Sequence, residues 1–418
     1  IANKNGKTAL SDSAVTERVA GYAWIRLVLS LILLTMGGSG MYAAIVTLQP
    51  IALEFGASRS EASLPYFLNT LGYGLGGVIM GRWSDRAGVM TPALFGGICL
   101  GGGFLLATQA QSLLTFALTH GLLIGFLGAS AFFAPLVADI SHWFVGRRGL
   151  AVGIVISGSY FAGAIWPPVL QHFIDLYGWR DTYFGVGVFC LAATAVFVPF
   201  LYPKYRAPSE TGTVATPLTV RPLGFAAGQL QCLLCIAGIG CCAAMAMPQV
   251  HLISYAGDLG FTAVDGAQML SLMLTCGIIS RLTSGWISDR IGGLKTLMLG
   301  SFLQMVALAV FIPVNSLQGL YLAAAFFGLT QGGIVPSYAM IVRSYFPAGD
   351  AGSRTGVVLF FTLIGMAVGG WMAGAIYDLT GSYDAAFINA IGFNILNLLI
   401  AGMLVRRASS RILSLRRA

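Results

Sequence analysis

One arginine within an apolar stretch is the residue best suited to chemistry in this sequence. Arg281 stands eight residues before Asp289, so on a helix rising about 1.5 Å per residue it lies about 12 Å from the polar boundary that Asp289 marks. An arginine near the middle of a hydrocarbon core costs about 2.5–3.5 kcal/mol, and no acidic residue at helical spacing on the same segment compensates its charge. A guanidinium matches a carboxylate with two parallel hydrogen bonds. We therefore expect Arg281 to bind an organic anion, with an ion pair to another helix, for example to Asp139, as the structural alternative.

Several polar or aromatic residues also interrupt apolar stretches and are candidates to line the same site. Tyr42, Asn69, His120, Tyr160 and Gln331 can supply hydrogen bonds, and Phe360 and Phe361 can supply walls. Of these, His120 could bond a carboxylate or exchange a proton near neutral pH, or it could make an ordinary bond between helices.

The composition requires that these residues sit in a membrane. Of 418 residues, 57% are hydrophobic and only 9% are charged, whereas soluble proteins are about one quarter charged. Apolar stretches of about 20 residues or more are long enough to cross a hydrocarbon core. They predict an all-α membrane protein with twelve transmembrane helices, near 22–54, 61–83, 89–108, 112–143, 149–176, 180–203, 223–256, 263–287, 294–313, 318–345, 354–378 and 385–405.

Basic residues are distributed unequally between the two sides of these spans. Only Arg59 and Arg180 fall in loops on one side, and only Arg281 lies deep in a span; the other lysines and arginines lie on or near the opposite side. By the positive-inside rule that side is cytoplasmic, so both termini are expected there, in a bacterial inner membrane or a plasma membrane. Membrane lipid explains the net charge of +8, and no nucleic-acid partner is expected.

A repeated sequence motif indicates that the two halves of the chain arose by duplication. Gly81-Arg-Trp-Ser-Asp85-Arg86-Ala-Gly88, after the second span, recurs after the eighth as Gly285-Trp-Ile-Ser-Asp289-Arg290-Ile-Gly292. The segment 204–222 is rich in Pro, Gly, Ser and Thr, which is typical of a connector. We therefore predict two pseudo-symmetric six-helix halves, at 22–203 and 223–405, joined by a cytoplasmic linker at 204–222, with a cytoplasmic tail at 1–21 and a basic cytoplasmic tail at 406–418.

The repeated loop resembles the signature of the major facilitator superfamily. This resemblance implies that the loop charges lock the cytoplasmic gate while such a carrier is open to the outside. It assigns gating roles to Asp85 and Arg86, to their counterparts Asp289 and Arg290, and to Asp139 as the usual partner of Arg86.

A second motif is similar to that of the monocarboxylate transporter family and its bacterial relatives, including the oxalate–formate antiporter group. It runs His142-Trp143-Phe144-Val-Gly-Arg147-Arg148-Gly149 into the fifth span. The resemblance implies that Arg281 binds substrate. Gly277 replaces the family's acidic residue one turn before this arginine, and 355–377 lacks the lysine with which oxalate–formate exchangers hold a second carboxylate.

Together these features predict a secondary active transporter of small organic monocarboxylates such as lactate or pyruvate, by alternating access with proton symport or anion exchange. The alternatives are a carrier of a larger amphipathic acid or of a dicarboxylate. An intramembrane receptor or enzyme is remote, because no span holds a Ser/His/Asp grouping or a metal cluster. No cofactor is expected, and no Gly-x-x-x-x-Gly-Lys-Ser/Thr loop for ATP is present.

Overall fold

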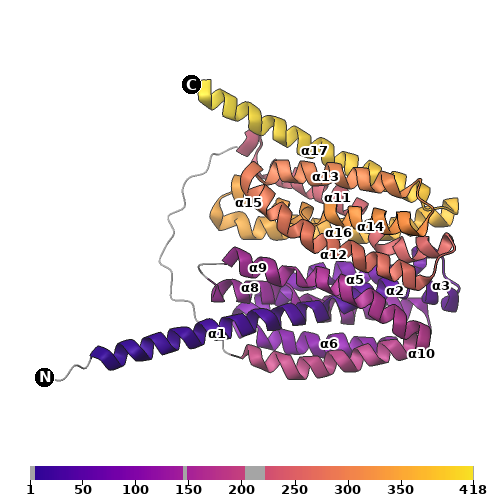
Figure 1. Cartoon of the computed structure of the whole chain (residues 1–418), viewed down its shortest axis with the longest axis horizontal. Coiled ribbons are helices and arrows are strands. Elements are labelled where there is room, and N and C mark those ends of the chain that lie inside the picture. The colour runs from indigo at the N-terminus through magenta and orange to yellow at the C-terminus, as the bar shows by residue number, and fades with distance from the viewer. Residues whose placement is uncertain (1–4, 145–147, 203–221, 418) are drawn as a thin grey trace.

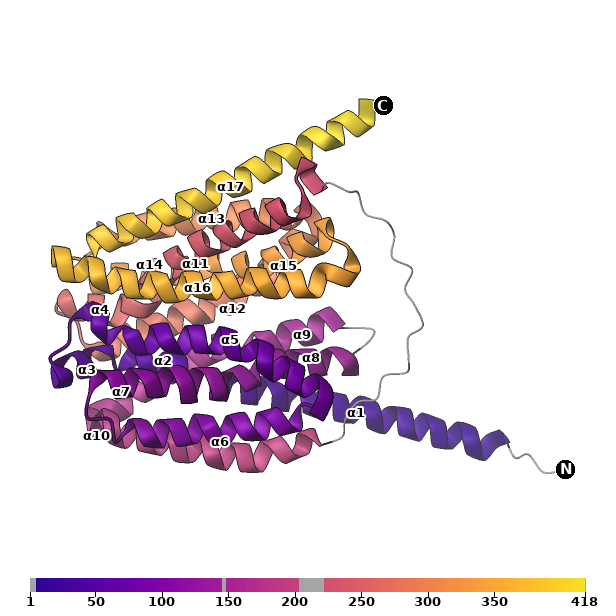
Figure 2. The same ribbon diagram turned by 180° about the vertical axis from the view of Figure 1, so that it is seen from behind.

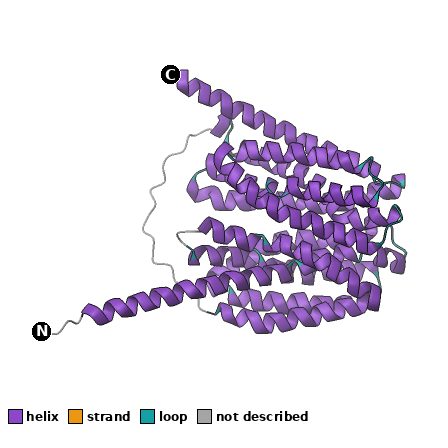
Figure 3. Ribbon diagram, in the orientation of Figure 1, coloured by secondary structure: helices purple, strands orange, loops and turns teal. Residues whose placement is uncertain are grey.

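The computed structural model describes residues 5–144, 148–202 and 222–417, and helices are the only regular elements in those ranges (Figure 3). In the first half of the chain they are α1 (Asn5–Gly37), α2 (Ser39–Val46), α3 (Leu48–Phe55), α4 (Arg59–Ala62), α5 (Leu64–Ala87), α6 (Met90–Ala107), α7 (Leu113–Leu118), the π-helix η1 (Thr119–Gly128), the 3₁₀-helix η2 (Ala129–Phe132), α8 (Ala134–Trp143), α9 (Arg148–Ile156), α10 (Gly158–Phe197) and the 3₁₀-helix η3 (Val198–Leu201).

The second half contains fewer and longer helices. They are the 3₁₀-helix η4 (Pro222–Gly224), α11 (Ala227–Asp258), α12 (Ala263–Ile291), α13 (Gly293–Phe311), α14 (Leu317–Gln331), α15 (Ile334–Tyr345), α16 (Ala348–Thr380) and α17 (Asp384–Arg417). The predicted linker at 204–222 lies almost wholly outside the described residues, and α1 begins within the stretch expected to be a tail.

Ten helical stretches in the described part are long and apolar enough to cross a membrane. Two further features reconcile this count with the twelve predicted spans. The stretch Leu150–Leu201 is 52 residues long and contains a sharp break at Gly178 (φ +79°), so it holds two spans. The other is α5, with 24 residues, which packs against η1 and α6 but falls outside the ten. The fold is therefore that of a twelve-helix membrane bundle.

The helices form two bundles that lie side by side. Figure 1 shows α1 to α10 in one bundle and α11 to α17 in the other, and Figure 2 shows the same division from behind. The bundles meet where α10 packs on α12, where α16 packs on α4 and α5, and where α11 approaches α2. The beginning of α1 and the end of α17 lie on the same side of the molecule (Figure 1).

The repeated loop has the same backbone geometry in both halves. Gly88 ends α5 with φ 85° and ψ 162°, and Gly292 ends α12 with φ 82° and ψ 157°. Residues with a side chain rarely adopt this conformation, so the last glycine of each repeat is required by the turn. The sequence repeat therefore corresponds to a structural one.

Several spans are interrupted instead of continuous. The first is broken at Gly38 and Thr47, the fifth at Ser157, and the tenth at Gly332 and Gly333. A break leaves backbone carbonyls without their usual helical donors, and other groups can use them.

Candidate anion-binding site

Arg281 lies on α12 at the interface between the two bundles and is half-buried. Its Nη1 donates to the carbonyl of Ile156 at 3.3 Å and its Nε to the carbonyl of Gly332 at 3.5 Å. The guanidinium carbon lies 4.5 Å from the centroid of the Tyr160 ring. Every one of these contacts is with a neutral group.

Both carbonyl acceptors lie at helix breaks. Ile156 ends α9 just before the break at Ser157, and Gly332 lies in the gap between α14 and α15. The backbone N–H of Gly332 donates to the hydroxyl of Ser280, next to Arg281 on α12, at 3.1 Å. The broken helices therefore orient the guanidinium without neutralising its charge.

No carboxylate in the described part of the chain forms an ion pair with Arg281. The ion pairs in that part join Arg26 to Asp139, Arg59 to Asp258, Arg180 to Glu54 and Arg354 to Asp350. None includes Arg281, so the predicted alternative of an ion pair with Asp139 is not the arrangement found. The positive charge of Arg281 is available to a ligand.

Two of the predicted aromatic residues lie with Arg281. Tyr42 is within electrostatic range of both Tyr160 and Arg281, and its hydroxyl donates to the carbonyl of Ser159 at 3.3 Å. Tyr66 and Tyr73, on α5, are also within range of Tyr42 and were not predicted. Tyr160 and Tyr42 therefore lie near the guanidinium, and Tyr66 and Tyr73 extend this aromatic cluster from Tyr42.

The two predicted amide residues, Asn69 and Gln331, are buried, and neither contacts Arg281 directly in the described residues. Asn69, on α5, has a side-chain oxygen with no hydrogen-bond donor. Gln331 immediately precedes Gly332; its oxygen accepts from Gln249 at 2.6 Å, and its nitrogen has no acceptor. Each amide thus has hydrogen-bonding capacity to spare.

His120 belongs to a separate cluster inside the first bundle. It is fully buried on η1, its Nε2 lies 3.0 Å from the Tyr183 hydroxyl, and its ring packs on Phe104 and Phe116. The Tyr183 hydroxyl also bonds Thr47 at 3.1 Å. The structure does not bring His120 to Arg281.

Phe360 and Phe361 lie on α16, with their rings nearly perpendicular and 6.2 Å apart. A Cβ added at Gly74 would come within 3.1 Å of the Phe360 ring, so this ring packs against α5 across the two bundles. Both side chains are half-buried, as walls of an interface would be.

The predicted gating residues of the two loops are exposed. Asp85 and Asp289 make no hydrogen bond or ion pair within the described ranges, and Arg290 stacks on Trp286 of its own helix. Asp139, expected to pair with Arg86, accepts bonds of 2.6 and 2.9 Å from Arg26. Arg26, which was not among the predicted site residues, is fully buried and packs on the Trp143 ring.

A polar contact between the bundles was also missed. Asp378, on α16, accepts from the backbone N–H groups of Arg59 and Ser60 at 2.8 and 2.9 Å, and Arg59 reaches Asp258 of α11 at 2.8 Å. Asp258 and Asp378 each end a span on the side where Arg59 stands, which was the signal available in the sequence. We call Arg59, Asp258 and Asp378 the cross-bundle lock.

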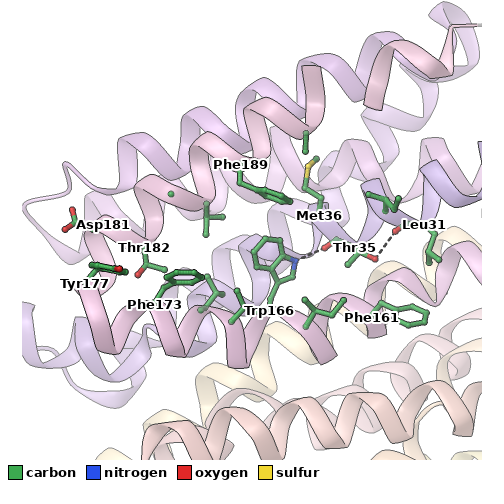
Figure 4. A pocket seen from close by; sticks show the side chains of 17 residues that line it. Leu31, Thr35, Met36, Phe161, Trp166, Phe173, Tyr177, Asp181, Thr182 and Phe189 are labelled. Carbon is green, nitrogen blue, oxygen red and sulfur yellow. Dashed lines mark hydrogen bonds between the residues drawn. The ribbon is translucent and has the colours of Figure 1, made fainter. Parts of the chain in front are cut away.

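An apolar groove of about 810 Å³ lies apart from all of these residues, between α1 and α10 (Figure 4). Phe161, Trp166, Phe173 and Phe189 line it, and the Trp166 indole donates to the Thr35 carbonyl at 2.9 Å. None of the predicted binding residues faces this groove, so it is not the anion site.

Comparison with known sequences identifies relatives over most of the chain. The family model described as Major Facilitator Superfamily matches residues 28–318 and again 232–415. Monocarboxylate transporter 13 of Rattus norvegicus is 28% identical over 82% of this chain and 79% of that protein. Monocarboxylate transporter 11 of Homo sapiens is 27% identical over 75% and 67%. The MFS-type transporter pynF of Aspergillus niger is 22% identical over 92% of each chain.

Solved structures share the architecture. A bacterial homologue of the human lysosomal transporter Spinster, in an inward-facing and occupied conformation, superposes with a TM-score of 0.70 over 93% of this chain and 97% of that one, at 13% identity. A peptide transporter, POT, in complex with sulfate gives a TM-score of 0.69 over 92% and 95%, at 15% identity. At such low identity the similarity concerns the fold alone.

Proposed function

This chain belongs to the Major Facilitator Superfamily and is a multi-pass membrane transporter, and from that premise we propose that it carries small organic monocarboxylate anions by alternating access. The observation that carries the proposal is the state of Arg281, a cation between the two bundles whose contacts are all neutral. A carboxylate bound there would supply the missing charge and two hydrogen-bond acceptors.

The relatives support the same class of ligand. Several are named as monocarboxylate transporters, and the chain covers most of their length. The chain fits a dicarboxylate less well, because a second carboxylate would need a second cation. The one basic residue of α16, Arg354, is paired with Asp350. Tyr160 and Tyr42 beside Arg281 favour a second candidate, a larger amphipathic acid whose body packs on aromatic rings.

We favour anion exchange over proton symport as the mode of coupling. Gly277 stands one turn before Arg281, and no carboxylate in the described residues contacts the guanidinium. Two titratable groups inside the spans, His120 and Asp139, are bonded within the first bundle.

We also propose that both termini face the cytoplasm and that the cross-bundle lock faces the opposite side. The basic residues of the loops support this orientation through the positive-inside rule. A cysteine introduced at Gly381 should react with an impermeant reagent from the side opposite the termini; reaction from the cytoplasmic side would contradict the orientation.

Arg281→Lys tests the binding role. The substitution keeps the charge but replaces a planar two-pronged donor by a point charge, so carboxylate affinity should fall by about tenfold or more while the protein stays folded. Thermal-shift titrations of pyruvate, lactate, benzoate and phenylacetate, each beside its amide, would measure this. A stable Arg281→Lys variant that binds its best carboxylate with wild-type affinity would refute the role.

A further inference from the structure

We propose that Tyr160 is the positioning residue for Arg281, acting from the opposite bundle in a space that only a glycine at 277 leaves open. This inference rests on the proposed function, in which Arg281 receives the carboxylate of the substrate. It concerns how the guanidinium is held ready for that ligand.

The first step is the position of the ring. Tyr160 lies on α10 of the first bundle, and its ring centroid is 4.5 Å from the guanidinium carbon of Arg281 on α12. At this distance an aromatic ring attracts a cation and covers one of its faces. The N–H donors of a guanidinium point outward in its plane, so stacking leaves them free for hydrogen bonds.

The second step is the remaining hydrogen-bonding capacity. The carbonyls of Ile156 and Gly332 accept long hydrogen bonds of 3.3 and 3.5 Å from Nη1 and Nε of Arg281. A guanidinium carries five N–H groups; in the described residues these carbonyls use two of them, and the Tyr160 hydroxyl makes one further interaction with the side chain. The ring and the two carbonyls therefore fix the orientation while leaving a donor for a ligand.

The third step is the role of Gly277. A Cβ at this position would lie 2.6 Å from Cδ1 of Tyr160, closer than real Cβ atoms come to a neighbour, and the three nearest atoms all belong to that ring. Residues four apart share a face of a helix, so Gly277 and Arg281 present one surface of α12. Any side chain at 277, acidic or not, would push the ring away from the guanidinium.

The fourth step is the anchoring of Tyr160 in its own bundle. Its N–H bonds the carbonyl of Ser157 at the helix break, and the neighbouring Ser159 carbonyl accepts from the Tyr42 hydroxyl. Gly163, one turn further on, makes room for Tyr42, because a Cβ there would overlap the Tyr42 hydroxyl. The ring is thus fixed to the first bundle while the cation that it orients belongs to the second.

Four variants, measured with the same carboxylate and amide panel, test the proposal. Tyr160→Phe keeps the ring and should bind the best carboxylate within about twofold of wild type. Tyr160→Leu removes the ring and should weaken that carboxylate by about tenfold. Gly277→Ala should weaken it comparably although Tyr160 is still present, and should add nothing in the Tyr160→Leu background. Gly392→Ala, at a glycine with open space around it, is the matched control and should be neutral.

The outcomes separate this inference from the proposed function. If no carboxylate stabilises the wild type, or if Arg281→Lys binds normally, the proposed function fails and this inference fails with it. If Arg281→Lys loses binding but Tyr160→Leu and Gly277→Ala keep it, only the positioning role is overturned. If Tyr160→Phe loses binding as Tyr160→Leu does, the effect belongs to the hydroxyl and not to the ring, and the positioning role is also overturned. If Tyr160→Leu fails to fold, the binding measured for Gly277→Ala and Tyr160→Phe still tests the positioning role of Tyr160.

Discussion

At the scale of single residues, two arginines lie within apolar helices and have different surroundings. Arg26 is fully buried and donates two short bonds to one carboxylate, that of Asp139. Arg281 is half-buried, and its contacts in the described residues are with two carbonyls and the Tyr160 side chain. An arginine neutralised by a carboxylate is a structural element, whereas one without such a partner is poised to take an anion.

Asp139→Asn should therefore destabilise the protein far more than Arg281→Lys does. Removing one member of a buried ion pair leaves the other charge uncompensated and costs about 3–5 kcal/mol. Thermal unfolding in detergent would measure the difference, and Arg26→Met combined with Asp139→Leu should recover most of the loss. An Asp139→Asn protein as stable as wild type, but altered in cysteine accessibility between the two sides, would instead favour the predicted gating role.

The sequence singled out Arg281 because its depth could be counted from Asp289 on the same helix. It could not reveal the pairing of Arg26, because Asp139 lies 113 residues away and nothing local marks the contact. The same limit applies to Tyr160, which was predicted as a site residue for its polarity, while its stacking on Arg281 depends on the packing of α10 against α12.

At the scale of elements, the helices followed from hydropathy but their interruptions did not. The breaks at Ser157 and Gly332 lie inside long apolar runs, where the average hydropathy of a window is insensitive to one turn of irregular backbone. These breaks matter because they expose the carbonyls that hold Arg281. The sharp turns at Gly88 and Gly292 could be anticipated, since both glycines belong to the repeated loop.

The cross-bundle lock joins the elements at one end of the interface. The Asp378 carboxylate accepts from the first N–H groups of α4, so α16 caps a short helix of the other bundle. Gly374 permits this approach, because a Cβ there would lie 2.8 Å from the Arg59 carbonyl. At the other end the loop carboxylates Asp85 and Asp289 are exposed. This is the arrangement expected of a carrier closed at the Arg59 end.

Asp378→Asn should shift the population toward opening at the Arg59 end. The amide keeps one acceptor but loses the charge, and charge-assisted bonds contribute about 1.5–3 kcal/mol each, so the shift should be about fivefold or more. With the seven native cysteines replaced, a single cysteine at the buried Ser254 should react faster with an impermeant reagent.

Two further substitutions control this measurement. Asp384→Asn, an exposed acid that begins α17, should leave the reaction rate unchanged. Asp85→Asn should slow it, because the loop charge is expected to hold the opposite end closed when the Arg59 end is open. Equal rates in all three variants would show that neither set of carboxylates governs the exchange between states.

At the scale of the whole molecule, the predicted family is confirmed. The repeated loop and the motif after His142 indicated the major facilitator superfamily and a similarity to monocarboxylate transporters, and the family model and the curated relatives agree. The expectation of a transporter and not an enzyme is confirmed in the same way. The closed end of the bundle interface was not predictable, because a carrier adopts all of its states with the same sequence. In addition, Arg59 lies 199 and 319 residues from the two aspartates that it bonds in the lock.

The coupling of transport to ion gradients belongs to the same scale, and it is the last prediction. His120, Asp139 and His251 are titratable groups within the described spans; each is bonded within its own bundle, and none of the three contacts Arg281. Without a carboxylate beside Arg281 to bind or release a proton as the anion arrives, substrate binding has no direct link to protonation.

In liposomes, uptake of the best-binding carboxylate should therefore rise with the concentration of that anion inside, and an inward proton gradient alone should drive no accumulation. Because a weak acid can also cross lipid in its neutral form, Arg281→Lys liposomes serve as the background. Accumulation driven by the proton gradient alone, above that background, would establish symport, and its loss in His120→Gln or His251→Gln would identify the group that carries the proton.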